Sequence, residues 1–172
     1  NNMFPSSTIS NAVVSASPFL VSLPFTLLDL NKFDKWESKA LWQPPGFVFG
    51  TVWPILYLGL FYMNYCILQV IPQFSSSFKN IVKRDTLIEA GLQAIWLWNF
   101  RYQPDIKGRS QMQYIKGLIS MISLVLFACY RIWVFYHHPS SWQFTIFYIP
   151  YAIWISFATI LNYQLVIGKV KL

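Results

Sequence analysis

The sequence predicts an all-α membrane protein, a bundle of five transmembrane helices forming a single domain over residues 1–172. Two observations lead to this fold class. Of the 172 residues, 55% are hydrophobic and only 11% are charged, a balance that a soluble domain of this size cannot bury. In addition, short polar stretches separate long apolar runs along the chain, and 19% of the residues are aromatic, the type that collects where a membrane meets water.

Three apolar runs are long enough to cross a bilayer. Residues 47–71 and 142–168 contain no acidic or basic side chain, and residues 117–136 contain only Arg131. Because Arg131 lies near one end of its run, we expect its long side chain to snorkel to the interface. These runs predict three spanning helices.

Two further spans rest on weaker patterns. The first apolar run contains Pro18 and Pro24, and the run over residues 86–100 contains Glu89. Prolines are tolerated in membrane helices packed against neighbours, and a lone acid in a span usually faces the bundle interior. We expect a loop over residues 72–85. The five predicted spans are residues 12–30, 45–71, 86–103, 114–136 and 142–168.

The basic residues indicate which partners and which orientation to expect. The formal net charge is +7, but the basic side chains are scattered through short loops, which favours lipid headgroups as neighbours and argues against nucleic acid. Under the five-span topology, nine of the 13 Lys and Arg residues fall on the C-terminal side and four on the other. This excess predicts a multi-pass protein with a cytoplasmic C-terminus.

Residues for ordinary catalysis are sparse. Cys66 and Cys129 fall inside apolar runs, without the spacing of metal ligands or of a disulfide framework. His137 and His138 are adjacent, so both rings cannot face one ligand on a regular element. We expect neither a metal site nor an obligatory cofactor, and no nucleophile or acid–base pair supports an enzyme.

The most informative stretch is W-Q-P-P-G-F-V-F-G-T-V-W-P-I-L-Y over residues 42–57. Its two prolines fit the cap and first turn of a helix. The spacing of Gly46 and Gly50 predicts the close approach of another backbone. Interface aromatics with a helix-packing glycine pair would explain the same pattern.

Two other stretches place polar and aromatic residues on one helix face. Residues 150–163 read P-Y-A-I-W-I-S-F-A-T-I-L-N-Y, in which Trp154 and Asn162 share a face. Glu89, Gln93 and Trp96 fall at positions i, i+4 and i+7, a polar stripe that ends in an aromatic ring. Interhelical hydrogen bonding is the alternative role for these amides.

Together these stretches resemble the translocator protein or tryptophan-rich sensory protein family (TspO/MBR, also called the peripheral-type benzodiazepine receptor family). The first is similar to W-x-P-P-x-x-x-F/L-x-x-V-W-x-x-L-Y and the second to P-Y-x-x-W-x-x-F-x-x-x-L-N. In the third helix, Glu89 and Gln93 stand where the family has Gln and Asn. Ala40 and Leu41 replace a basic-proline pair, and Tyr114 replaces a Trp, which marks a divergent member.

The resemblance implies a pocket for porphyrins and other flat hydrophobic ligands, sterols among them. A tetrapyrrole would stack on aromatic faces while its carboxylates bind polar groups at the rim. A weaker sterol pattern, for which a helix end anchored at headgroups is the alternative, comprises Leu161, Tyr163 and Lys169. Carried over by position, the ligand-binding residues are Trp42, Trp53, Trp96, Trp154, Phe157, Ala158 and Asn162.

The leading hypothesis is therefore a membrane receptor or carrier that binds tetrapyrroles and hands them over. The alternative is a structural accessory subunit of a larger respiratory or photosynthetic complex, motivated by the departures at Ala40, Glu89, Gln93 and Tyr114. Light-dependent porphyrin breakdown, associated with some family members, is a third hypothesis. The resemblance also implies a homodimer and, by association, the mitochondrial outer membrane or another organelle membrane.

Overall fold

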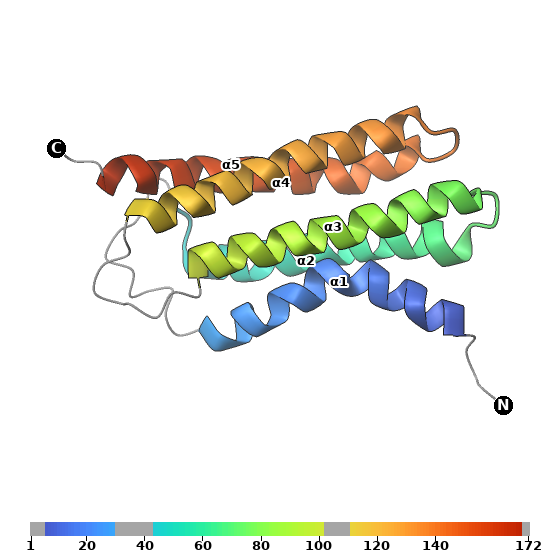
Figure 1. Cartoon of the computed structure of the whole chain (residues 1–172), viewed down its shortest axis with the longest axis horizontal. Helices are drawn as coiled ribbons and strands as arrows, with labels where there is room; N and C mark the ends of the chain where they lie inside the picture. Colours follow the sequence, from blue (N-terminus) through green and yellow to red (C-terminus); the bar gives the residue numbers. More distant parts are fainter. Residues whose placement is uncertain (1–5, 30–42, 102–110, 170–172) are drawn as a thin grey trace.

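The computed structural model describes residues 6–29, 43–101 and 111–169, and every regular element within these ranges is helical. The predicted all-α class is therefore confirmed. Five long helices run side by side (Figure 1). They are α1 (Ser6–Asp29), α2 (Gly46–Tyr65), α3 (Ser76–Arg101), α4 (Gln111–His137) and α5 (Thr145–Lys169), with a π-helical turn η2 (Cys66–Val70) after α2 and a 3-10 turn η3 (Trp142–Phe144) before α5.

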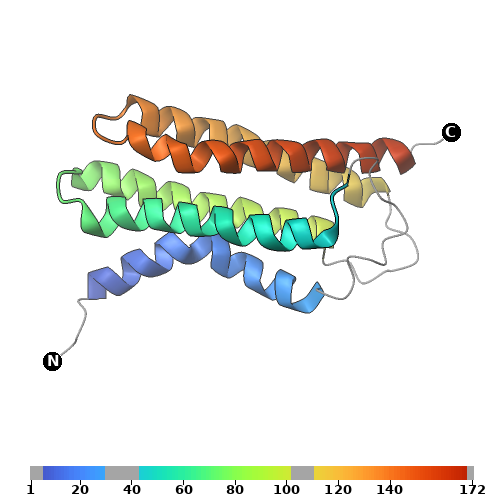
Figure 2. The same ribbon diagram turned by 180° about the vertical axis from the view of Figure 1, so that it is seen from behind.

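The five helices form a closed ring. α1 packs on α2, α2 on α5, α5 on α4, α4 on α3, and α3 on α1. The connections from α2 to α3 and from α4 to α5 lie at the same end of the bundle, which we call the turn end (Figure 2). The last turns of α3 and α5 and the first turns of α2 and α4 lie at the opposite end, the C-terminal end.

Three helical stretches are long and apolar enough to cross a membrane: Gly46–Val70, Gln111–His137 and Trp142–Gly168. The bundle also exposes many large apolar side chains, while its interior holds the charged Asp85, Glu89 and Arg131 together with an apolar core. Leu58 is 67% exposed, whereas Arg131 is 0% exposed. So many large apolar side chains on the outer surface are unusual for a soluble protein and fit a lipid environment.

The loop predicted over residues 72–85 is wrong, because α3 already begins at Ser76. Ser75 caps the helix, with its Oγ accepting a hydrogen bond from the backbone N–H of Phe78 at 3.2 Å. The charged residues of the first turns lower the local hydropathy without ending the helix. They divide between its faces, since the side chain of Arg84 is 59% exposed and that of Asp85 only 1%.

α1 is bent near its middle (Figure 1), where Pro18 lies within the helix and removes a backbone donor. Its first half is held to the end of α2 by side chains. Asn11 Nδ2 donates to Gln69 Oε1 at 2.8 Å and to the Leu68 carbonyl at 3.3 Å. Gln69 Nε2 in turn donates to Thr8 Oγ1 at 3.0 Å. Polar contacts therefore fix the position of α1 beside η2.

Two local expectations have different outcomes. The close backbone approach predicted at Gly50 is wrong, because a Cβ atom added there would meet no atom within 4 Å. Cys66 is buried and Cys129 is exposed, and both are free thiols. The expectation that cysteines inside apolar runs are core or lipid-facing residues is therefore confirmed, since Cys66 lies in the core and Cys129 on the outer surface.

Replacing Asn11 with Leu should loosen the docking of α1. The variant loses both hydrogen bonds of the amide nitrogen, and hydrogen bonds between membrane helices contribute about 1 kcal/mol each. We expect a lower midpoint in thermal unfolding of the detergent-purified protein. Ser10→Ala, an exposed neighbour on the same helix, should leave the midpoint unchanged, and equal losses in both variants would contradict the docking role.

Candidate functional site

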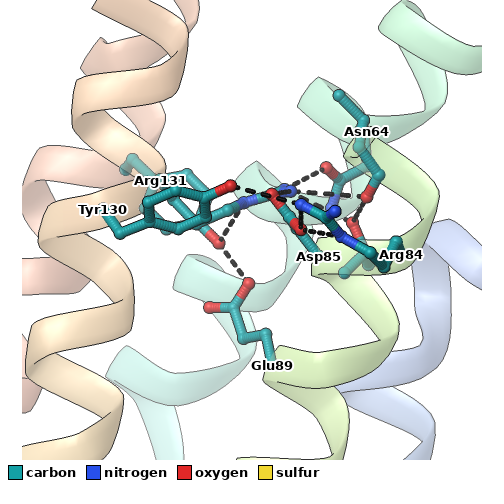
Figure 3. Close-up of polar contacts among 9 residues, drawn as sticks. Asn64, Arg84, Asp85, Glu89, Tyr130 and Arg131 are labelled. Atoms are coloured by element: carbon teal, nitrogen blue, oxygen red, sulfur yellow. Dashed lines mark hydrogen bonds and ion pairs between the residues drawn. The ribbon is translucent and has the colours of Figure 1, made fainter. Parts of the chain in front are cut away.

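Arg131 lies at the centre of a buried polar layer (Figure 3). It is close to the end of α4 that connects to α5, and so to the turn end of the bundle. Its predicted position at the membrane interface is wrong, because α4 turns this residue into the ring, where it is 0% exposed. A guanidinium has five N–H donors, and each of them faces an acceptor here. The acceptors are Tyr148 Oη (3.2 Å from Nε), Val82 O (3.3 Å from Nη1), Asp85 Oδ2 (3.7 Å from Nη1), Asn64 Oδ1 (3.1 Å from Nη2) and Thr86 Oγ1 (3.3 Å from Nη2).

Asp85 connects this layer with the outer surface of α3. Its Oδ1 accepts hydrogen bonds from Arg84 Nε at 2.9 Å and Nη2 at 2.8 Å. Arg84 also donates to the Tyr130 hydroxyl at 3.3 Å, and Figure 3 shows this contact. The 3.7 Å contact of Asp85 with Arg131 is an ion pair that is too long for a hydrogen bond. One carboxylate thus lies between a buried and an exposed guanidinium.

Glu89 faces the bundle interior, as predicted for a lone acid in a span, and is 1% exposed. The hydroxyl of Tyr148, which accepts from Arg131, donates to Glu89 Oε2. One turn farther along α3, Gln93 Nε2 donates to the Tyr151 hydroxyl at 2.8 Å. Glu89 Oε1 and Gln93 Oε1 are buried and have no hydrogen-bond partner among the described residues.

Three tryptophans from three helices meet next along the bundle, toward the C-terminal end. The ring centroid of Trp53 on α2 lies 5.6 Å from that of Trp96 on α3 and 6.2 Å from that of Trp154 on α5. Trp53 also stacks on Tyr57 at 5.5 Å with an interplanar angle of 24°. The structure therefore brings together three residues that the resemblance assigns to ligand binding, and we call these three the aromatic layer.

The far side of the aromatic layer contains further predicted residues. Trp154 contacts Phe49 at 5.5 Å and Phe157 at 5.7 Å between ring centroids. Asn162, two turns beyond Trp154 on α5, is only 2% exposed. Neither polar atom of the Asn162 amide, nor Trp154 Nε1, has a hydrogen-bond partner among the described residues. Buried polar atoms without partners are costly and uncommon in proteins.

The remaining predicted residues divide between the core, the surface and the undescribed segments. Ala158 packs against the main core, and Leu161 is buried. Tyr163 is 53% exposed, so it and Leu161 face different surroundings. Trp42 lies outside the described residues, as does the side chain of Lys169, the last residue of α5.

Comparisons with known proteins identify the family. The model of the TspO/MBR family matches residues 14–167. The chain belongs to the TspO/MBR family. It is also 30% identical over 126 residues to the human protein named Translocator protein, a match that covers 73% of this chain and 68% of the human one. Membership of the TspO/MBR family supports a membrane ligand-binding translocator.

The polar layer of this TspO/MBR protein was not predicted, although the sequence contains a signal for it. Asp85 and Glu89 are four residues apart and therefore share one face of α3. Two acids facing the interior of a membrane bundle need a cation or a proton. Arg131 is the one basic residue inside the three long apolar runs, and this pattern favours pairing across helices over snorkelling.

Replacing Arg131 with Met should strongly destabilise the bundle. The variant leaves Glu89 buried without the cation to which Tyr148 links it and leaves Asp85 with only the exposed Arg84. Breaking a buried charge pair typically costs about 3–5 kcal/mol. We expect a large drop in the unfolding midpoint in detergent or nanodiscs. Adding Asp85→Asn and Glu89→Gln to this variant should recover part of the loss, because no unpaired charge then remains.

Arg84→Met is the matched control, since it removes an exposed arginine from the same carboxylate of Asp85. Its effect on the midpoint should be small, because surface ion pairs contribute little. Equal effects of the two arginine substitutions would contradict the central role of Arg131.

Proposed function

We propose that the protein is a membrane receptor or carrier that binds porphyrins and other flat hydrophobic ligands, sterols included, between α2, α3 and α5. The observation that supports this most directly is the aromatic layer, in which Trp53 contacts both Trp96 and Trp154. A macrocycle would stack on the indole faces. Its carboxylates would accept hydrogen bonds from Trp154 Nε1 and Asn162 Nδ2, both of which are buried and unpaired.

Entry of a ligand into this layer exchanges one set of aromatic contacts for another. The indoles touch one another directly, so a flat ligand must separate Trp53 from Trp96 or from Trp154. The separated rings regain stacking contacts with the ligand, because offset stacking between aromatic systems is favourable whichever ring supplies it. Binding followed by release, without chemical turnover, fits the human relative's name, Translocator protein.

We also propose that α1 and α3 cross the membrane together with the three apolar helices. At 1.5 Å per residue, the 24 residues of α1 and the 26 residues of α3 extend about 36 and 39 Å, more than the roughly 30 Å of a bilayer core. Both helices lie in the closed ring. Asp85 and Glu89 are buried within that ring, so α3 need not expose them to lipid.

The proposed orientation keeps the C-terminus on the cytoplasmic side. Arg131 is buried inside the bundle, so it is not counted among the basic residues on either side of the membrane. The excess of basic residues on the C-terminal side then becomes nine against three, with all 13 accounted for, and basic residues favour the cytoplasmic face. The mitochondrial outer membrane, or another organelle membrane, remains the proposed location by association with the family.

A scaffold role in a larger complex is the second candidate. The direct contacts of Trp53 with the other two tryptophans and the four hydrogen bonds of Arg131 also fit a well-packed structural core. Isolation of a stable homodimer free of other chains would oppose this role. Consistent co-purification with respiratory or photosynthetic subunits would support it.

Protoporphyrin binding should depend on the aromatic layer. We expect saturable binding in the micromolar range, roughly 8 kcal/mol, measured as a shift of the porphyrin Soret band on titration with detergent-purified protein. The Trp53→Phe, Trp154→Phe double variant should bind about tenfold more weakly, because smaller rings offer less stacking.

The matched control removes two indoles that face outward, Trp98 and Trp133, which are 54% and 59% exposed. Trp98→Phe with Trp133→Phe should leave the affinity unchanged, and an equal weakening would place the porphyrin elsewhere. Illumination of the same samples tests porphyrin breakdown. A binding protein leaves the Soret band as stable as in free porphyrin, whereas an enzyme would remove it faster in the parent than in Trp53→Phe.

A further inference from the structure

The boundary between the polar layer and the aromatic layer is lined by hydrogen-bond acceptors. Glu89 and Gln93 are each 1% exposed, and each has one side-chain oxygen without a partner among the described residues. The other polar atom of each side chain is occupied, Glu89 Oε2 by Tyr148 and Gln93 Nε2 by Tyr151. Because an ionised carboxylate has only acceptors, Glu89 Oε1 needs a donor.

The neighbouring groups leave acceptor capacity at that oxygen, because no donor among the described residues makes a hydrogen bond with it. Arg131 makes four hydrogen bonds to other acceptors and a longer ion pair with Asp85, and it is linked to Glu89 through the hydroxyl of Tyr148. Tyr151 also faces Glu89, and its hydroxyl, which accepts a hydrogen bond from Gln93 Nε2 at 2.8 Å, keeps its own O–H to direct toward the Glu89 carboxylate. Asp85, the other acid of the polar layer, has its own arginine partners. Neither oxygen of Glu89 contacts a guanidinium, and Oε1 is the one of the two that has no hydrogen bond among the described residues.

The position of these acceptors relates them to the aromatic layer. Trp96 follows Glu89 by seven residues and Gln93 by three on α3, which places all three on one face. The Trp96 ring in turn contacts Trp53. A flat molecule between the indoles would thus bring one edge to Glu89 and Gln93. Indole faces also attract cations. The unpaired acceptors and the indole faces therefore both favour a ligand that carries a cationic N–H group.

We propose that this site prefers flat apolar ligands whose buried edge carries an N–H donor, above all a protonated amine that pairs with Glu89 Oε1 and Gln93 Oε1. The proposal rests on the proposed function, because it places the amine ligand in the same aromatic layer. It adds a ligand class, flat amines, that stacking alone would not distinguish from neutral ring systems. It also makes Glu89 the residue that determines the preference for flat amines over neutral ring systems.

The test compares two probes with the same ring system, 1-pyrenemethylammonium and 1-methylpyrene. The protein is held in nanodiscs of zwitterionic phosphatidylcholine, and energy transfer from tryptophan to pyrene is corrected for partition into empty nanodiscs. We expect the parent to bind the ammonium probe about tenfold more tightly, about 1.4 kcal/mol. Glu89→Gln, which keeps the shape and the acceptor for Tyr148, should abolish this preference and leave 1-methylpyrene binding unchanged.

Asp85→Asn is the charge-matched control, since it removes one negative charge a single turn away. Its oxygens contact arginines, so the variant should retain the preference for the ammonium probe. Equal affinity of the two probes for the parent, or loss of the preference in Asp85→Asn as complete as in Glu89→Gln, would overturn the inference.

Protoporphyrin binding that persists in either case would leave the proposed function standing. Ammonium binding that depends on Glu89, without any protoporphyrin binding, would support the inference and reject the porphyrin.

Discussion

The structure depends on the burial of one guanidinium, that of Arg131, inside a bundle whose outer surface is apolar. A charge buried in this way is tolerated only when its donors are all satisfied, because an uncompensated ion in a low dielectric costs several kcal/mol. The acceptors for Arg131 come from α2, α3 and α5, whereas the residue itself lies on α4. One side chain therefore limits how four of the five helices can rotate and slide against one another.

The hydrogen bonds of Arg131 also determine the positions of the three tryptophans of the aromatic layer. The Tyr148 hydroxyl links Arg131 to Glu89 and so fixes the height of α5 relative to α3. One turn farther along both helices, Tyr151 meets Gln93. Continuing in the same register brings Trp154 and Trp96 to the level of Trp53, which contacts both rings. The polar layer thus positions the rings that the proposed ligand would occupy, although no charged group touches those rings directly.

The fold class and much of the aromatic layer can be predicted from the sequence, because long apolar runs and helical spacing depend only on residues close together in the chain. The prediction that Glu89 faces the bundle interior is confirmed, because an acid in a membrane span avoids lipid. Arg131 was misplaced, because the distance to the end of an apolar run does not reveal partners such as Asn64 and Thr86, which are 67 and 45 residues away in the chain. The start of α3 was missed for a related reason, since average hydropathy does not separate the exposed Arg84 from the buried Asp85.

The contrast between the two layers bears on whether the bundle is a scaffold or a ligand-binding protein. A bundle retained only for packing gains stability from each buried polar group that finds a partner, and the donors of Arg131 follow that rule. The groups around the aromatic layer do not, since Glu89 Oε1, Trp154 Nε1 and the Asn162 amide are buried and unpaired among the described residues. Each such group costs about 1–3 kcal/mol, which a ligand with matching polar groups would recover on binding. Buried polar atoms without a hydrogen bond occur elsewhere too, at Asn11 Oδ1, Asn64 Nδ2 and Asp85 Oδ2. Those of Glu89, Trp154 and Asn162 differ in lying on both sides of the same ring faces, which is what a binding site for a flat ligand with polar edges requires.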